Sequence, residues 1–299
     1  LDNIGTLGFR GEALHAIANA SEFKMISKNK NMNEATEIVV LYGKLTRSRP
    51  SKGYLGTLII VKNLFKKLPV RRKFLKSDKV ESLAIKNFIT KISLAYPNIT
   101  FIFSQDNKEK LNLLGRQENN NIEARIKEIY GENFLKSSFY DEKKHPDFQI
   151  KIYASIPTYN KSNWQQTTII INGRIIKDKL FLGVIKAAYA GLLAGNRFPV
   201  VALYINIKPT NLDINVHPAK TEVRILNRNL LNSSIIKIIR NNLEKIGLRY
   251  SVETEKELIK KIKKHNELKF NKDLLDIGMN LFDVKNKEED NKFLYEKEN

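Results

Sequence analysis

The chain has 299 residues, 42% of them hydrophobic, which is enough for one or two globular domains with sizeable cores. It contains no cysteine, so disulfides and thiolate metal sites are excluded. The four histidines show no ligand spacing, and we expect no structural metal. No apolar run is long enough to cross a membrane. The absence of cysteines favours an intracellular setting. The chain starts at Leu1 with neither a signal peptide nor an initiator methionine, which favours a fragment of a longer protein.

The formal net charge is +20, and the excess is unevenly distributed. It reaches +9 over residues 51–100, +6 over 151–200 and +5 over 201–250, whereas residues 251–299 carry −1. A genome-wide preference for lysine would raise the charge of this tail as well. The basic blocks therefore favour a surface that meets a polyanion such as nucleic acid.

The first predicted elements follow a pair of glycines. Gly8 and Gly11 in LGFRGEAL precede a helix predicted at 12–20, and such glycines let a phosphate approach a helix N-terminus. A tight loop with an ordinary helix cap is the alternative. Alternating apolar and polar residues then predict strands at 21–29, 35–43, 44–50 and 57–65.

A helical apolar pattern covers 71–96, a strand is predicted at 98–105, and the polar, Asn-rich stretch at 106–120 is the candidate domain boundary. Asn172-Gly173 indicates a hairpin turn. The second half is predicted to contain helices at 122–135, 177–195 and 229–247 and strands at 148–156, 167–175, 200–208 and 212–217.

Three stretches in register resemble the N-terminal ATPase region of the MutL family of DNA mismatch repair proteins. They are LGFRGEAL at 7–14, GTLIIVKNLFKKLPVRRKFL at 56–75, and NGRIIKDK at 172–179 followed by LDINVHPAKTEVRI at 212–225. The resemblance implies an α+β fold. It begins with an incomplete ATP-binding domain of the gyrase/Hsp90/histidine-kinase/MutL type at 1–110. A transducer and DNA-binding domain like domain 2 of ribosomal protein S5 follows at 111–248, and a charged, largely disordered linker at 249–299.

The resemblance also implies nucleotide-binding residues. The lid over ATP would contain Gly8, Phe9, Arg10, Gly11 and Glu12. Thr57 would lie near the adenine. Lys220 would reach the γ-phosphate, where a cation both senses the nucleotide and assists catalysis.

DNA-binding residues are implied in two places. Arg174, Lys177 and Lys179 fall where the family has a positively charged groove for DNA, double- or single-stranded. Arg71 and Arg72 would either extend this groove or hold the two domains together.

One part of the family's catalytic machinery is not matched. The general-base glutamate and the Asp-Asn-Gly-x-Gly motif, which reads adenine and binds Mg²⁺, are expected upstream of the lid. Asp2-Asn3-Ile4-Gly5 lies too close to the lid and lacks the glycine after Asn3, so we reject it as this motif. We therefore expect the parent protein to be a slow, Mg²⁺-dependent ATPase and this fragment alone to hydrolyse little ATP.

The implied function is an ATP-driven clamp on DNA that forms a homodimer in the full-length protein. Its implied partners are a mismatch-recognition protein of the MutS type, a repair helicase and the sliding clamp, in the cytoplasm and at the nucleoid of a bacterium. Gly278–Phe282 faintly resembles a clamp-binding peptide. The alternatives are a non-catalytic nucleic-acid-binding module and a type II topoisomerase ATPase subunit.

Overall fold

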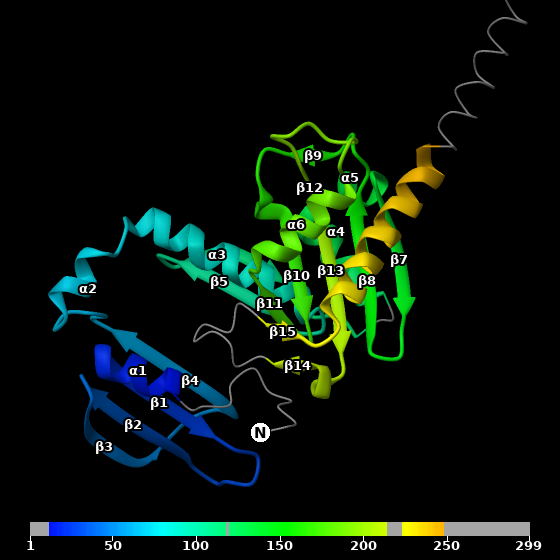
Figure 1. Ribbon diagram of the computed structural model, residues 1–299. Helices are drawn as coiled ribbons and strands as arrows, with labels where there is room; N and C mark the ends of the chain where they lie inside the picture. The colour runs from blue at the N-terminus through cyan, green and yellow to red at the C-terminus, as the bar shows by residue number, and fades with distance from the viewer. Residues whose placement is uncertain (1–11, 118–119, 214–222, 248–299) are drawn as a thin grey trace, which may run out of the picture. The chain divides into compact units, whose positions relative to one another are not determined.

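A computed structural model describes residues 12–117, 120–213 and 223–247 as a mixed α/β chain (Figure 1). Residue contacts divide the chain into two units, Leu1–Ile236 and Lys237–Asn299, and the elements named below lie in the first. None of the helices in the described ranges is long and apolar enough to span a membrane.

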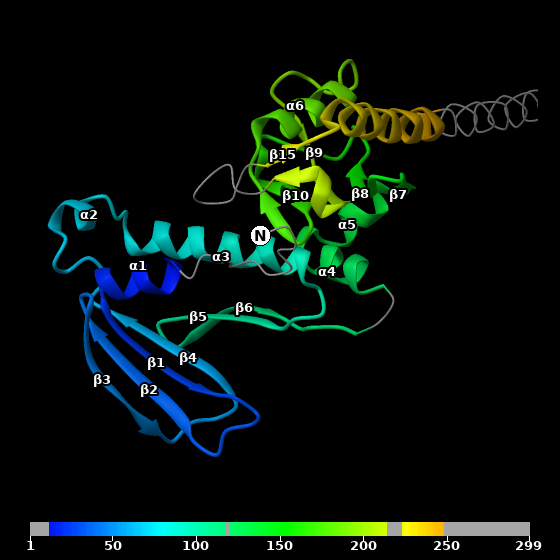
Figure 2. The ribbon, with the colours of Figure 1, turned by 60° about the horizontal axis from the view of Figure 1, so that its bottom comes forward.

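The first sheet is antiparallel, with the strand order β3-β2-β1-β4. Its strands are β1 (Glu22–Lys28), β2 (Ala35–Leu41), β3 (Lys44–Ser51) and β4 (Gly56–Lys62). Helix α1 (Glu12–Ala20) packs against one face of this sheet (Figures 1 and 2). Tyr42 and Gly43, both with positive φ, make the tight turn between β2 and β3. These elements confirm the helix and the four strands predicted from the sequence.

The long helix predicted at 71–96 is in fact two helices, α2 (Pro69–Lys73) and α3 (Asp78–Ala95). Ser77 is the N-cap residue of α3. Its backbone is extended, so α3 is not continuous with α2. The Glu81 carboxylate also accepts a hydrogen bond of 3.0 Å from the Lys76 N–H. Because the apolar spacing continues through this break, periodicity alone did not reveal it.

The polar stretch at 106–120 contains the turn and second strand of a β-hairpin, in which the predicted strand β5 (Phe101–Gln105) pairs with β6 (Lys108–Leu113). Asp106 and Asn107 have φ values of 51° and 58°, as a two-residue hairpin turn of the primed type requires. Asp and Asn tolerate this left-handed backbone better than most residues, so this polar pair marks the turn between β5 and β6.

The second sheet has the order β11-β10-β13-β8-β7, in which β10 and β13 are parallel and the other neighbours are antiparallel. Its strands are β7 (Ser138–Lys144), β8 (Phe148–Ser155), β10 (Thr167–Ile171), β11 (Arg174–Ile176) and β13 (Val201–Ile207). The helices of this region are α4 (Asn121–Tyr130), α5 (Glu132–Lys136) and α6 (Lys179–Ala188). Two short strand pairs are β9 (Asn160–Lys161) with β12 (Phe198–Pro199) and β14 (Leu212–Asp213) with β15 (Arg224–Ile225). The sequence did not predict β7, whose polar sequence SFYDEKK lacks a clear alternation.

Helices cover both faces of the second sheet (Figure 2). On one face, Leu94 of α3 and Ile126, Tyr130 and Phe134 of α4 and α5 form a core cluster with strand residues such as Ile170. The other face lies under α6, whose Phe181 and Ile185 are fully buried. Since Leu94 belongs to α3, this helix is anchored to the second sheet by its C-terminal end.

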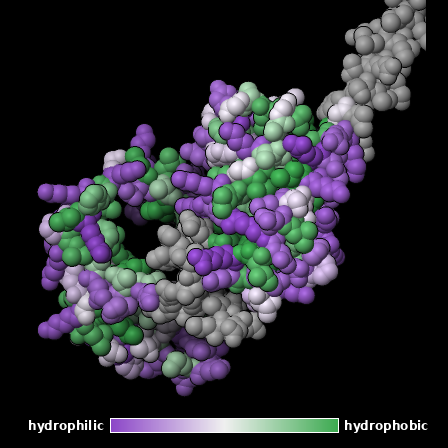
Figure 3. All heavy atoms as spheres, in the orientation of Figure 1, coloured by the Kyte–Doolittle hydropathy of each residue, from purple (hydrophilic) through white to green (hydrophobic). Residues whose placement is uncertain are grey.

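Hydrophobic side chains remain at the surface over the first sheet and on α3, and Figure 3 shows such residues between polar ones. The exposed fractions are 54% for Leu58 and 42% for Val61 on β4, and 58% for Leu83 and 56% for Phe88 on α3. The core beneath the second sheet is therefore more complete than the one beside the first.

Candidate functional site

The structure describes two of the predicted nucleotide-binding residues, Glu12 and Thr57. The others lie outside the described residues: Gly8, Phe9, Arg10, Gly11 and Lys220. Glu12 is exposed and begins α1. The Thr57 hydroxyl lies on β4, with its oxygen 2.9 Å from Oγ of Ser27 on the neighbouring strand β1.

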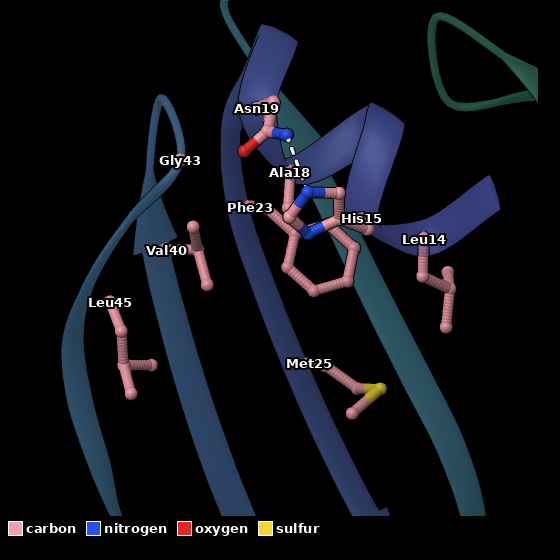
Figure 4. A pocket seen from close by; sticks show the side chains of 9 residues that line it. All are labelled: Leu14, His15, Ala18, Asn19, Phe23, Met25, Val40, Gly43 and Leu45. Carbon is pink, nitrogen blue, oxygen red and sulfur yellow. Dashed lines mark hydrogen bonds between the residues drawn. The ribbon is translucent and has the colours of Figure 1, made fainter. Parts of the chain in front are cut away.

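Strand register places Thr57 on the face of the first sheet that carries α1. Ser27 pairs with Thr57, and Phe23, an even number of residues before Ser27 on β1, points to the same side. Phe23 lines a pocket together with Leu14 and Ala18 of α1 (Figure 4). Thr57, α1 and this pocket therefore share one face of the sheet.

The pocket has a volume of about 290 Å³ and an apolar lining that includes Met25, Val40 and Leu45. Its polar part is the pair His15–Asn19, whose Nε2 and Nδ2 atoms are 2.9 Å apart (Figure 4). Among the residues that the structure describes, no lysine or arginine lines it, so this part of its lining suits an apolar side chain or ring rather than a phosphate. The sequence did not predict this pocket, because its lining comes from four separate elements.

The predicted DNA-binding loop is the hairpin of β10 and β11 with the residues that follow it. Asn172 and Gly173 form its turn with φ values of 48° and 77°, which confirms the predicted hairpin. The Asn172 side chain fixes the turn to β13, since it accepts a hydrogen bond from the Ile207 N–H and donates one to the Ile207 carbonyl, both 2.8 Å. The loop is therefore held rigidly at one edge of the second sheet.

The three basic residues of this loop have different environments. Lys177 and Lys179 are exposed, whereas Arg174 is only 7% exposed, on the side of β11 shared with the buried Ile176. Arg174 also takes part in an interaction of its own. The two lysines are thus accessible to a polyanion. The Arg174 side chain offers much less accessible surface for the predicted contact with DNA.

A fourth basic residue, Lys91 of α3, lies beside this loop. The two elements run antiparallel to each other: a Cβ at Gly173 would lie 2.8 Å from the Tyr96 hydroxyl, and Ile175 packs against the cluster that contains Leu94. Lys91 is one helical turn before Leu94, and Lys177 lies two residues beyond Ile175. This alignment brings the two lysines together.

Two effects lower the pKa of the half-buried Lys91: burial first, and then repulsion from the Lys177 ammonium. None of the described carboxylates forms an ion pair with Lys91, Lys177 or Lys179. A positive charge concentrated in this way attracts an anion, and phosphate is a suitable one.

Arg71 and Arg72 belong to α2, where both are exposed. Neither has an ion-pair partner within the ranges that the structure describes. Their predicted role, in DNA binding or in holding two domains together, stays a prediction.

The segment that contains Lys220 runs between β14 and β15, which pair through Leu212 with Ile225 and Asp213 with Arg224. A hydrogen bond of 3.1 Å from the Leu226 N–H to the Asn211 carbonyl extends this pair. The predicted sensing lysine and the neighbouring His217 lie outside the described residues, as does the peptide at 278–282.

Comparison with known proteins gives related sequences. The family model described as "DNA mismatch repair protein, C-terminal domain" matches residues 126–244. The DNA mismatch repair protein MutL of Rickettsia bellii is 39% identical over 243 residues, which is 81% of this chain and 40% of that protein. MutL of Rickettsia prowazekii is 40% identical over the same length, with 41% of its own length covered. The chain thus spans about two fifths of the curated relatives that it matches.

Two solved structures share the fold. The Aquifex aeolicus MutL ATPase domain complexed with ADP has a TM-score of 0.53 and 25% identity, over 66% of this chain and 72% of that one. The N-terminal domain of a DNA repair protein has a TM-score of 0.65 and 21% identity, over 83% and 78% of the two chains. These likenesses confirm the predicted α+β fold class with an ATPase domain of the MutL type.

Proposed function

We propose that this chain, which belongs to the MutL family of DNA mismatch repair proteins, binds ATP and DNA and couples the two as a conformational clamp. The observation that carries the DNA part is the lysine cluster formed by Lys91, Lys177 and Lys179. The cluster combines a loop at the edge of the second sheet with helix α3, whose C-terminal end packs on that sheet. A phosphate bound there would contact both.

Binding at this cluster would follow the DNA backbone. Lysine ammonium groups contact phosphate oxygens and read no base edges, so affinity should depend weakly on sequence and strongly on salt. Arg71 and Arg72 would add to the positive surface. Arg174 would contribute directly only if its buried side chain became accessible.

The nucleotide would bind on the α1 face of the first sheet. The Aquifex relative was solved with ADP, and Thr57 lies on that face beside Ser27. The lid residues 8–12 and Lys220 would enclose the phosphates, so that ATP orders the lid and hydrolysis releases it. As the family resemblance implies, the Mg²⁺ ligands and the general base would lie in the parent protein, upstream of the lid.

The parent protein would be a slow ATPase that dimerises and holds DNA while it recruits other factors. Its partners would be a MutS-type mismatch-recognition protein, a helicase and a sliding clamp, inside the cell. Membership in the MutL family favours this role over a type II topoisomerase subunit. A nucleic-acid-binding module without ATP dependence is the second candidate for the chain by itself, because Lys91 lies on α3 and Lys177 directly follows β11 of the second sheet, whereas the nucleotide would bind on the first sheet.

DNA binding by the chain, titrated across salt with and without a non-hydrolysable ATP analogue, tests the proposal. We expect the double reversal Lys177→Glu/Lys179→Glu to weaken binding and to reduce the salt slope by about 2, one for each phosphate that a lysine no longer neutralises. The matched control is Lys136→Glu/Lys144→Glu. It makes the same change in net charge at exposed positions on α5 and β7, and β7 is the opposite edge of the sheet.

If both double variants weaken DNA binding equally, the effect comes from the change in net charge alone, and the assignment of DNA binding to this loop is wrong. If the analogue strengthens binding, the clamp proposal is supported for the chain itself. Binding that ignores the analogue supports the second candidate, the module without ATP dependence.

A further inference from the structure

Asp178 lies between the two exposed lysines of the DNA-binding loop, where an acidic residue would be expected to weaken phosphate binding. Its side chain is nevertheless not presented to solvent, since the residue is 7% exposed. Lys177 and Lys179, immediately before and after it, are exposed. The carboxylate therefore points inward at the place where its neighbours point outward.

Both carboxylate oxygens have inward partners. Oδ1 accepts a hydrogen bond of 2.8 Å from the Leu180 N–H, which makes Asp178 the N-cap of α6. Oδ2 pairs with Nη2 of Arg228 at 2.5 Å. The Arg228 guanidinium in turn lies 5.1 Å from the ring centroid of Phe181, a fully buried residue in the first turn of α6.

Arg228 comes from a distant part of the chain. It follows β15 and lies fifty residues beyond Asp178. The pair therefore ties the start of α6, and with it the basic loop, to the segment that leaves β15. A charge-assisted pair with little solvent exposure is stronger and more directional than a surface ion pair.

We propose that Asp178 is a positioning residue for DNA binding: paired with Arg228 and capping α6, it holds Lys177 and Lys179 outward and keeps its own charge away from the phosphates. This inference rests on the proposed DNA-binding function of the loop. It predicts that removing the negative charge of Asp178 weakens the binding of a polyanion. If only the net charge of the loop mattered, the same change would strengthen that binding.

The test is DNA binding by the full chain with Asp178→Asn, measured by fluorescence anisotropy of a labelled duplex across salt. Asparagine caps helices as well as aspartate does, so α6 keeps its N-cap while the charge on Arg228 loses its partner. We expect affinity to fall by about fivefold and the salt slope to become shallower, because the displaced lysines neutralise fewer phosphates. Arg228→Gln should have the same effect, and the double variant should be no weaker than either single one, since both break one interaction.

The outcomes separate the inference from the function on which it rests. If Asp178→Asn tightens binding or leaves it unchanged, Asp178 acts only as a charge or a helix cap and the inference is wrong. A loss of thermal stability with an unchanged salt slope likewise indicates a purely structural role. If Lys177→Glu/Lys179→Glu also has no effect, the DNA-binding proposal itself has failed. Arg228→Lys keeps the positive charge, so it should retain more affinity for DNA than Arg228→Gln. Comparing these two variants tests the inference if Asp178→Asn does not fold.

Discussion

Arg125 is the largest side chain that the described residues bury completely. Its Nη2 group lies 2.8 to 3.2 Å from the carbonyl oxygens of Pro97, Ile99 and Leu114. These carbonyls belong to the connection between α3 and β5 and to the chain after β6, where no helix or sheet ladder pairs them. Burial lowers the pKa of Arg125, and Glu128 beside it acts in the opposite direction. One guanidinium therefore joins α4 to both connections.

Replacing Arg125 with alanine should destabilise the fold strongly. The change removes a fully buried donor from three carbonyl oxygens and creates a cavity, so we expect a loss of at least about 3 kcal/mol in the free energy of unfolding. Urea denaturation measures it. Arg116→Ala is the control, because Arg116 pairs with Glu128 at the surface and its removal should cost less than about 1 kcal/mol. Similar losses of stability in both variants would contradict the importance of burial here.

At the scale of elements, the chain after β6 runs in backbone contact with the chain before β5. The Arg116 N–H donates to the Pro97 carbonyl at 3.1 Å, and the Gly115 N–H donates to Oγ1 of Thr100 at 2.8 Å. A Cβ at position 115 would lie 2.4 Å from the Asn98 carbonyl oxygen. The two ends of the β5–β6 hairpin are therefore closed by a contact that only glycine permits.

Two glycine-to-alanine changes should act in opposite directions. Gly115→Ala forces backbone apart, and we expect it to destabilise the protein by more than about 2 kcal/mol. Gly183 lies inside α6 with nothing within 4 Å of its added Cβ, so Gly183→Ala should stabilise by about 0.5 to 1 kcal/mol. Thermal melting of the two variants checks both signs. A neutral Gly115→Ala would mean that the two connections separate easily.

At the scale of the whole molecule, several tyrosines are buried around the second sheet. Burial raises the pKa of Tyr153 to about 12, and it raises the pKa values of Tyr130, Tyr189 and Tyr204 as well. In the unfolded chain these groups ionise near pH 10. Between about pH 10 and 12 the folded state therefore binds more protons than the unfolded state, and stability falls as the pH rises.

Tyr153→Phe should make this alkaline loss of stability less steep, because one group with a raised pKa is removed. The measurement is the slope of the free energy of unfolding against pH between pH 9.5 and 12. Tyr54 is 97% exposed, so Tyr54→Phe is the matched control and should leave the slope of the wild type unchanged. An unchanged slope in Tyr153→Phe would show that this hydroxyl ionises equally in both states.

The sequence predicted most helices and strands, but not the arrangement that creates the basic cluster. Alternation and the Asn172-Gly173 pair located the β10–β11 hairpin, and Lys177 and Lys179 were named from the resemblance. Lys91 was not, because its distance from Lys177 depends on how α3 lies along β11, and spacing along the chain does not encode that. The inward direction of Asp178 likewise depends on Arg228, a residue far away in sequence.

The strand order of the first sheet leaves β3 and β4 as its edges, and they are chemically unlike. β3 carries Lys44, Arg47, Arg49 and Pro50, which discourage the addition of another strand. β4 reads GTLIIVK and has no charge before its last residue. Within the described part of the chain, a strand added to this sheet would therefore meet charged side chains and a proline at β3, and an edge almost free of charge at β4.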